Sequence, residues 1–513
     1  MSAKSYTKQI RYLILITAIV KMSIAPLLEL GNDEVYYWTY ALQLDWNHFD
    51  HPPMIGLLIR LTSFNLLWAN EFSLRLGSII AASISTWFVF KIAALLSNER
   101  TGWFTALIYT ASIYTGFIAG FFILPDSPQM PFYTASLYVM TQILFSKNDL
   151  PKTKYWLLLG ALIGIALLCK VHALFLWAGF GLFILLKKRS ELLNWRLYLS
   201  AGISFLGTLP IFYWNWTNNF ITYKFHSNRV THGGIKLDSF LNEILGEFAY
   251  QNPIIFILLL IAIISLLKKK IIFSLKNASV WLFCMSIPML LVFWSISLFN
   301  STLPHWTGPA FIPLFIIGGL YLDKKSGTDF PIWNKASIFL VAIVLILGIL
   351  LIRLSPINFG SKDKANYGEY CPTLDMSGWN ELGKSFALIV KKDIAENKIR
   401  ANAVLLANNW FPAGHLEFYV SPIAQMPLIG IGLLADLHKF AWLNQKRPYL
   451  KIGSDAYCIV PSNLPINVKE VYGVYFKEIQ APIILPQIRC GGTVRYFYIY
   501  RLKGCINIPK AIL

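Results

Sequence analysis

Long apolar runs recur between residues 12 and 353, and they constrain the fold more than any other feature of the sequence. Tyr12 to Leu28, Ser78 to Leu96 and Ile254 to Leu267 are three examples. Several runs approach the roughly 20 residues that a helix needs to cross a bilayer. Their length and continuity exclude a transmembrane β-barrel, whose strands alternate polar and apolar side chains. With 56% hydrophobic and 14% charged residues, the chain is predicted to be an α-helical, polytopic membrane protein.

We expect about eleven transmembrane helices from the apolar runs. Residues 155–187 are interrupted only by Lys170 and His172, and we interpret them as two short spans. The predicted spans are residues 12–28, 76–97, 103–122, 129–145, 155–170, 172–187, 197–214, 254–268, 278–299, 307–322 and 337–353.

Basic and acidic residues alternate between successive connections. Every second connection is basic, and the others carry acids, so the positive-inside rule predicts a cytoplasmic N-terminus and acidic loops on the outer face. This topology explains the excess of 45 Lys and Arg over 26 Asp and Glu better than a nucleic-acid partner does. The basic residues are Lys147, Lys152, Lys154, Lys187, Lys188, Arg189, Arg196, Lys268, Lys269, Lys270, Lys276, Lys324, Lys325 and Lys335. The outer loops are residues 29–75, 123–128, 215–252 and 300–306.

Residues 354–513 have a mixed composition and are predicted to form a separate, small, extracytoplasmic α/β domain that follows a transmembrane domain of residues 1–353. We expect helices at 379–392 and 433–443, and strands at 403–407, 416–420, 456–460, 470–476 and 494–500. Its acids, such as Asp375, are scattered among polar neighbours and are interpreted as a solvated surface. Four of the six cysteines lie here, and the spacing leaves disulfides and free thiols equally open.

Two outer loops concentrate ionisable and aromatic residues. The first contains Asp33 and Glu34 before an aromatic run, and then Asp50 and His51. An acidic loop in the interfacial aromatic belt would also have this composition. In the second loop, Asp126 stands alone between apolar runs, where it could be either a site residue or the N-cap of the next helix.

These motifs resemble those of the polyprenyl-phosphate-sugar-dependent glycosyltransferases of the GT-C fold. The similarity points to the bacterial relatives of the protein O-mannosyltransferases and of the lipid A aminoarabinose transferase. It extends over nearly the whole chain, and the combination is specific although no single motif is. The matching motifs are Asp33-Glu34-x-Tyr36-Tyr37-Trp38, Phe49-Asp50-His51-Pro52-Pro53-Met54, Pro125-Asp126-x-Pro128, Lys224-Phe225-His226, Leu303-Pro304-His305-Trp306 and Ser377-Gly378-Trp379.

The resemblance implies that a sugar is transferred from a polyprenyl-phosphate donor, with inversion, to an acceptor at the extracytoplasmic face of the inner membrane. Such a displacement needs a base for the acceptor hydroxyl and stabilisation of the leaving phosphate. By family position Asp33 is the predicted base and Glu34 the alternative. Asp126 is predicted to share their catalytic site.

The resemblance also implies roles for cationic and imidazole groups. Asp50 and His226 match positions that hold a divalent metal in the aminoarabinose branch, so zinc, manganese or magnesium is a possible cofactor. That branch usually has Lys where this chain has His51, which is charged only part of the time near neutral pH. Binding of the donor phosphate is therefore predicted for His51, Lys170, Arg229 and His305.

The competing hypothesis is a multi-span secondary transporter or a flippase for lipid-linked sugars. Transporters keep ionisable residues near the bilayer midplane, whereas the acids of this chain lie in predicted outer loops. An enzyme is therefore favoured. The expected partners are the lipid-linked sugar, membrane lipid and a glycan, lipid or protein acceptor.

Overall fold

The computed structural model describes residues 6–146, 152–230, 234–510 and 513. Lys147 lies outside these residues. The chain forms two compact units, which we call the membrane unit (Met1–Ala25 and Asp45–Val344) and the C-terminal unit (Pro26–Leu44 and Leu345–Leu513). This division differs from the predicted boundary at residue 353, because Pro26–Leu44 groups with the C-terminal residues.

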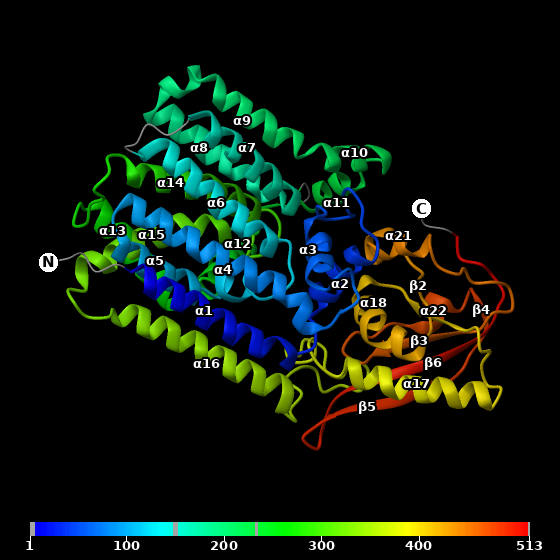
Figure 1. The fold of residues 1–513 in the computed structure, drawn as a ribbon. Helices are drawn as coiled ribbons and strands as arrows, with labels where there is room; N and C mark the ends of the chain where they lie inside the picture. The colour runs from blue at the N-terminus through cyan, green and yellow to red at the C-terminus, as the bar shows by residue number, and fades with distance from the viewer. Residues whose placement is uncertain (1–5, 147–151, 231–233, 511–512) are drawn as a thin grey trace. The chain divides into compact units, whose positions relative to one another are not determined.

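The described part of the membrane unit is helical (Figure 1). Helix α4 packs against α1, α5 and α6, α7 packs against α6 and α9, and α15 packs against α5, α13 and α14. The helices are α1 (Thr7–Ile24), α3 (Met54–Thr62), α4 (Glu71–Leu96), α5 (Glu99–Ala111), α6 (Asp126–Phe145), α7 (Lys152–Cys169), α8 (Leu174–Lys187), α9 (Trp195–Leu206), α10 (Leu209–Thr217), α11 (Ile221–Val230), α12 (Leu237–Tyr250), α13 (Pro253–Leu267), α14 (Ala278–Ser297), α15 (Phe311–Lys325) and α16 (Ile332–Leu354), which continues into the C-terminal unit.

Each predicted span coincides with a helix or a pair of consecutive helices. Within the described residues, five helical segments are long and apolar enough to cross a membrane, and the bent pair α12–α13 would make a sixth. Other predicted spans are shorter. Helix α13 has 15 residues, or about 22 Å at 1.5 Å per residue, against a hydrocarbon core of about 30 Å. The number of crossings therefore stays a prediction, while the multi-span helical architecture is confirmed.

Helices of the membrane unit break next to the predicted outer loops. Helices α12 and α13 meet at an angle of 100°, and Asn252 stabilises the bend. The Asn252 Nδ2 donates to the carbonyl oxygens of Ala111 and Ser337, at 3.0 and 3.1 Å, and its Oδ1 accepts from the backbone N–H of Ile254 at 3.1 Å. The side chain thus satisfies backbone groups that a broken helix leaves without partners. A π-helical turn, Tyr114–Ile118, similarly follows α5.

The C-terminal unit contains a mixed sheet. Among its described residues six strands are found, in the order β2-β1-β3-β6-β4, with β5 also paired to β6. Strand β1 is parallel to β2 and β3, whereas β6 is antiparallel to β3, β4 and β5. The elements are α2 (Asn32–Leu42), α17 (Trp379–Ala395), β1 (Val404–Ala407), α18 (Trp410–His415), α19 (Ser421–Ala424), β2 (Leu428–Gly430), α20 (Leu434–Leu437), α21 (Phe440–Asn444), β3 (Ala456–Pro461), α22 (Val468–Tyr472), β4 (Phe476–Ile479), β5 (Ile483–Arg489) and β6 (Gly492–Cys505).

The predicted α/β domain is confirmed, with local differences. Residues 416–420 continue α18 as a π-helical turn and do not form the predicted strand. In this turn the Tyr419 ring lies 6.2 Å from the His415 ring. Residues 470–476 divide into the end of α22 and the start of β4, and 433–443 contains two short helices, α20 and α21. All six cysteines lie within the described residues, and each is a free thiol.

Candidate functional site

A buried ion pair joins the start of α6 to the end of α7 in the membrane unit. The Lys170 Nζ lies 2.9 Å from Oδ1 and 2.8 Å from Oδ2 of Asp126. Both residues are almost fully buried, with exposed fractions of 2% and 1%. An ammonium inside a helical bundle is costly unless it is paired, and Asp126 supplies its counter-charge. Lys170 therefore does not extend along the protein surface towards the interface.

The surroundings of Asp126 exclude its interpretation as a helix N-cap. Pro125 occupies the cap position, and no side-chain cap bond is present at this helix end. The Asp126 Oδ1 instead accepts from the Tyr114 hydroxyl at 2.8 Å, in addition to Lys170. The Gln129 side chain donates to the carbonyl oxygen of Lys170 at 2.7 Å. The carboxylate is thus fixed by two donors and belongs to a polar cluster.

Two predicted phosphate-binding histidines lie within electrostatic reach of this ion pair. Burial lowers the pKa of His51 to about 4, with further effects from the charges of Asp50, Lys170 and Asp126. Burial likewise lowers the pKa of His305 to about 4, with further effects from the charges of Lys170 and Asp126. Both imidazoles are consequently neutral at pH 7. The expectation that His51 is partly charged near neutral pH is therefore wrong, because burial disfavours the imidazolium.

His172, the second ionisable residue of the apolar run that contains Lys170, belongs to the same region. Its ring stacks on Phe293 at 5.0 Å between centroids and lies 6.3 Å from the ring of Trp306. Both of its ring nitrogens are buried, and neither forms a hydrogen bond within the described residues. His172 is thus a further polar group that the resemblance did not identify.

The predicted metal ligands, Asp50 and His226, are neighbours. The Nε2 of His226 lies 2.9 Å from the backbone carbonyl oxygen of Asp50, and its ring lies 6.3 Å from that of His51. Among the described residues, no group of three or more His, Cys, Asp or Glu side chains could hold one metal ion. Zinc sites in proteins normally have three or four protein ligands. The described side chains therefore do not form such a site, and we derive no chemical step through a metal.

The membrane unit thus contains residues from each of the three predicted groups, for catalysis, phosphate binding and metal binding. These are Asp50, His51, Asp126, Lys170, His226 and His305. Arg229 lies in α11, in a turn whose side chains are outside the described part of the structure. The pairing of Asp126 with Lys170 and the participation of Tyr114 were not apparent from the sequence, because they depend on a tertiary contact between separate helices.

The two predicted acids of the first loop lie in the first turn of α2, in the C-terminal unit. Asp33 is exposed, whereas Glu34 is buried, with an exposed fraction of 2%. The Glu34 Oε2 accepts from the backbone N–H of Gly31 at 2.9 Å. A carboxylate three residues into a helix commonly bonds back to the residue that precedes the helix. Glu34 therefore has a structural role at the start of α2, and Asp33 is the more accessible acid.

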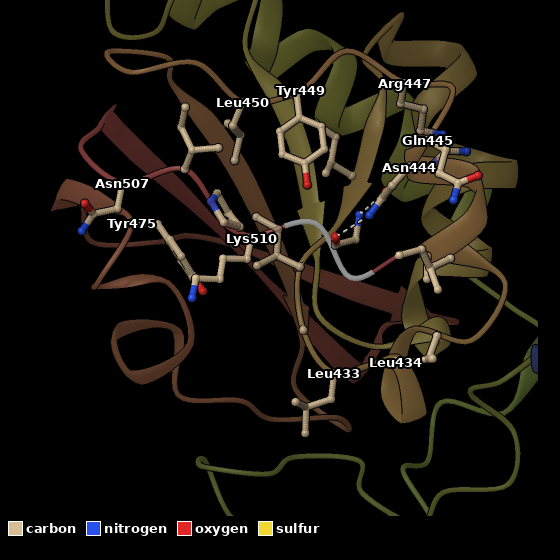
Figure 2. A pocket seen from close by; sticks show the side chains of 18 residues that line it. Leu433, Leu434, Asn444, Gln445, Arg447, Tyr449, Leu450, Tyr475, Asn507 and Lys510 are labelled. Atoms are coloured by element: carbon tan, nitrogen blue, oxygen red, sulfur yellow. Dashed lines mark hydrogen bonds between the residues drawn. The ribbon is translucent and has the colours of Figure 1, made fainter. Parts of the chain in front are cut away.

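A pocket of about 830 Å³ lies in the C-terminal unit (Figure 2). Its described lining combines apolar and aromatic side chains with the cations Arg447 and Lys510, and it includes no Asp, Glu or His. Arg447 is already paired with Glu417 at 2.7 Å. The Asn444 side chain bonds both the N–H and the carbonyl of Gly430, at 3.0 and 2.7 Å. This lining suits binding better than acid–base chemistry.

Comparisons with known proteins agree with this architecture. Residues 50–214 match the family described as dolichyl-phosphate-mannose-protein mannosyltransferase. The lipid A galacturonosyltransferase RgtD of Rhizobium johnstonii is 23% identical over 301 residues, which cover 58% of this chain and 61% of RgtD. The chain thus spans less than two thirds of that relative.

Two solved structures of ArnT from Cupriavidus metallidurans are also similar. The apo structure has a TM-score of 0.58 and 14% identity, and the alignment covers 96% of this chain and 97% of that one. The structure bound to undecaprenyl phosphate has a TM-score of 0.57 and 15% identity, and the alignment covers 96% and 98% of the two chains. At 14–15% sequence identity, this similarity shows the fold alone.

The predicted resemblance is confirmed. Part of the chain is similar to a mannosyltransferase family and to a lipid A galacturonosyltransferase, and the chain has the GT-C fold of ArnT, with several apolar helices and a small C-terminal domain.

Proposed function

We propose that this protein transfers a sugar from a polyprenyl-phosphate donor to an acceptor at the extracytoplasmic face of the inner membrane, with inversion at the anomeric carbon. The buried Lys170–Asp126 pair carries this proposal. An ammonium has three N–H donors. Two of them are directed at the oxygens of Asp126, which leaves the third for a phosphate oxygen of the donor. The bound undecaprenyl phosphate in the similar ArnT structure supports this donor class.

In the proposed reaction, an acceptor hydroxyl attacks the anomeric carbon and loses its proton to the Asp33 carboxylate. The new bond joins the acceptor oxygen to the anomeric carbon, and the bond between that carbon and the phosphate oxygen breaks. Polyprenyl phosphate leaves with the bonding electrons. Asp33 suits the role of base because it is exposed, whereas the carboxylate of Asp126 is engaged by Lys170 and Tyr114.

The neutral histidines have a different proposed role from Lys170. His51 and His305 carry no charge at pH 7, so each can donate one hydrogen bond to the phosphate without adding to its electrostatic stabilisation. Asp126 holds Lys170 in a fixed orientation. This pre-organisation avoids the cost of reorienting the ammonium when the leaving group gains charge.

For the acceptor we propose a lipid of the lipid A type, on the basis of the activity named for the relative RgtD. The pocket of the C-terminal unit has two cations and several amides, which are suited to a phosphorylated saccharide. Glycan and protein acceptors are the alternatives. Comparing the lipids and glycans of a deletion strain with those of its parent identifies the acceptor, and unchanged lipid A would contradict this part of the proposal.

Release of free polyprenyl phosphate tests the reaction against the transporter alternative. Purified full-length protein is incubated with undecaprenyl phosphate carrying a labelled sugar, and the lipid phosphate released is quantified by chromatography. We expect release that requires an acceptor and that stops in Lys170→Met. Lys154→Met, which changes an exposed lysine in α7, is the matched control and should keep the parental rate. Movement of the labelled lipid across vesicles without any release would support a flippase instead.

The orientation of the C-terminal unit can be tested with its own thiol. Cys490 is exposed, whereas the other five cysteines are buried. We propose that this unit is extracytoplasmic, so an impermeant thiol reagent should label intact spheroplasts and should not label the Cys490→Ser variant. Labelling that appears only after lysis would place the unit in the cytoplasm.

A further inference from the structure

Three of the four residues that precede Asp33, namely Glu29, Leu30 and Asn32, form hydrogen bonds with the C-terminal part of the chain. The carboxylate of Glu29 accepts from the backbone N–H groups of Trp379 and Asn380, at 2.8 and 3.0 Å, and so caps the N-terminus of α17. The backbone N–H of Leu30 donates to the Tyr419 hydroxyl at 2.6 Å. Hydrogen bonds thus hold Glu29 and Leu30, two successive residues that precede α2.

Asn32, the residue next to Asp33, has the most specific contacts. Its backbone N–H donates to Oδ1 of Asp375 at 2.8 Å. Its side-chain Oδ1 lies 2.8 Å from Nε2 of His415. The same His415 nitrogen lies 3.4 Å from the Asp375 carboxylate, so the three residues form a closed set of polar contacts. Asp375 thus makes specific contacts although its side chain is 38% exposed, in line with its predicted place at the surface.

His415 is itself held rigidly. Its imidazole is fully buried and stacks on the indole of Trp379 at 4.2 Å, with an interplanar angle of 4°. The guanidinium of the buried Arg495 lies 4.5 Å from the centre of the same indole. Burial lowers the pKa of His415, which favours the neutral ring. The atoms that face Nε2 are oxygens of Asn32 and Asp375, so this geometry fits the tautomer that donates from Nε2.

The polar contacts around Asn32 impose stricter geometric requirements on α2 than apolar packing would. A polar set inside a domain is favourable only when its members are matched to one another, and an apolar contact would hold α2 with fewer constraints. Here the polar contacts converge on the residue next to an exposed carboxylate. A misplacement of about 1 Å in a reacting group can cost roughly 100-fold in rate, so fixing this backbone has a direct catalytic value.

We infer that Asp375 and His415 are positioning residues for Asp33, and that they orient the first turn of α2 through Asn32. The inference rests on the proposed function, in which Asp33 accepts the proton of the acceptor. It assigns the C-terminal unit a part in catalysis in addition to the choice of acceptor.

The test compares kcat and KM for four variants of the full-length protein in the polyprenyl-phosphate release assay. Asp375→Ala removes the acceptor for the Asn32 N–H, and His415→Phe keeps the ring stack but removes the donor to Asn32. For both we expect kcat to fall about 10- to 100-fold, with the KM for the donor unchanged. Asp375→Asn keeps an oxygen acceptor and should recover most of the rate. Glu381→Ala, at an exposed acid of the same unit, should keep the parental kcat.

A double-mutant cycle separates positioning from a loss of folding. If Asp375 and His415 act through Asp33, adding Asp375→Ala to Asp33→Asn should leave the residual rate unchanged, because the group they orient is already inactive. A further 10-fold loss in the double variant would overturn the inference, since it would reveal an effect independent of Asp33. The thermal unfolding midpoint of each variant is measured in parallel.

The outcomes also distinguish this inference from the proposed function. If Asp33→Asn keeps the parental rate, the base itself is misassigned. If Asp33→Asn is inactive while Asp375→Ala and His415→Phe both keep the parental kcat, Asp33 remains the base and the positioning role is refuted. If Asp375→Ala fails to fold, the kcat of Asn32→Ala, which removes only the side-chain contact to His415, decides the question in the same way.

Discussion

Asp33 and Asp126 are both acids of predicted outer loops, yet their environments are opposite. Asp126 is buried in the membrane unit and bonded to an ammonium and a phenol. Asp33 is exposed in the first turn of α2 in the C-terminal unit, where the backbone before it is fixed by other side chains. The carboxylate of Asp126 is immobilised by its partners. At Asp33 the surrounding side chains fix the main chain, and the Asp33 side chain is exposed.

This difference indicates that Asp33 and Asp126 have different roles. A carboxylate that already accepts from a cation and a hydroxyl is a poor proton acceptor, because protonation would break both interactions. It is well suited to orienting the cation. A carboxylate that is accessible but has a fixed position can meet a substrate hydroxyl in a defined geometry. The comparison therefore predicts that substitutions at the two acids have different effects.

The largest effect is expected for Asp33→Asn. The change is isosteric and removes only the capacity to accept a proton, so transfer should fall about 100- to 10,000-fold while undecaprenyl phosphate still binds. Turnover and equilibrium binding are measured on the same preparation. Glu34→Gln is the matched variant, and its amide oxygen can still accept from Gly31, so it should keep most of the activity. The reverse pattern would make Glu34 the base.

Asp126→Asn should mainly reduce stability and donor binding. Removing one partner of a buried ion pair leaves the other charge uncompensated, which typically costs about 3–5 kcal/mol. The double variant Asp126→Leu with Lys170→Met should recover much of the unfolding midpoint, but it should not recover binding of undecaprenyl phosphate. Full stability of Asp126→Asn with a selective loss of turnover would instead make Asp126 the base and remove the contrast with Asp33.

The sequence predicted the helices better than the site. Each apolar run became a helix because lipid and protein interior both favour apolar side chains, and Lys170 and His172 correctly indicated a break. The pairing of Asp126 with Lys170 was not predictable, since it joins residues 44 positions apart. The grouping of Pro26–Leu44 with the C-terminal unit was missed for the same reason, because hydropathy describes only local preference. Tyr419 lies in residues 416–420, which were predicted to form a strand, and His415 directly precedes them.

A second buried pair in the protein has no proposed catalytic role. In the C-terminal unit, Asp393 accepts from Nη2 of Arg501 at 2.8 Å and from the Tyr457 hydroxyl at 2.7 Å. Asp393→Asn should destabilise this unit by about 1.5–3 kcal/mol, as expected for hydrogen bonds to a charged group. Donor binding should not change. The unfolding midpoint is followed by limited proteolysis of the full-length protein.

The same pair predicts a dependence on pH. Burial alone would raise the pKa of Asp393, but hydrogen bonds from Arg501 and Tyr457 lower it overall. A lowered folded-state pKa contributes stability above the unfolded value of about 3.9, and this contribution is lost as the pH falls through the folded-state pKa. The parent should therefore lose more stability than Asp393→Asn between pH 5 and pH 3. Equal losses would contradict the assignment.

The smallest effect is expected from metal removal. Because the described residues contain no group of three suitable ligands, we expect exhaustive chelation to change donor binding by less than about twofold. His226→Ala should behave in the same way under chelation. A large loss that zinc or manganese restores in the parent, but not in His226→Ala, would show that the donor and the two residues Asp50 and His226 hold an ion together.

The grouping of Pro26–Leu44 with Leu345–Leu513 has a consequence for the order of biosynthesis. The partners of helix α2 leave the ribosome only about 300 residues after it does. At roughly 5–20 residues per second, this interval lasts about 15–60 s. Until then Asp33 has no fixed backbone, so a nascent or prematurely terminated chain is expected to be inactive even when its membrane helices have inserted. Under the proposed function, catalysis through Asp33 therefore requires that the sheet of the C-terminal unit, including β6, has been synthesised and has folded.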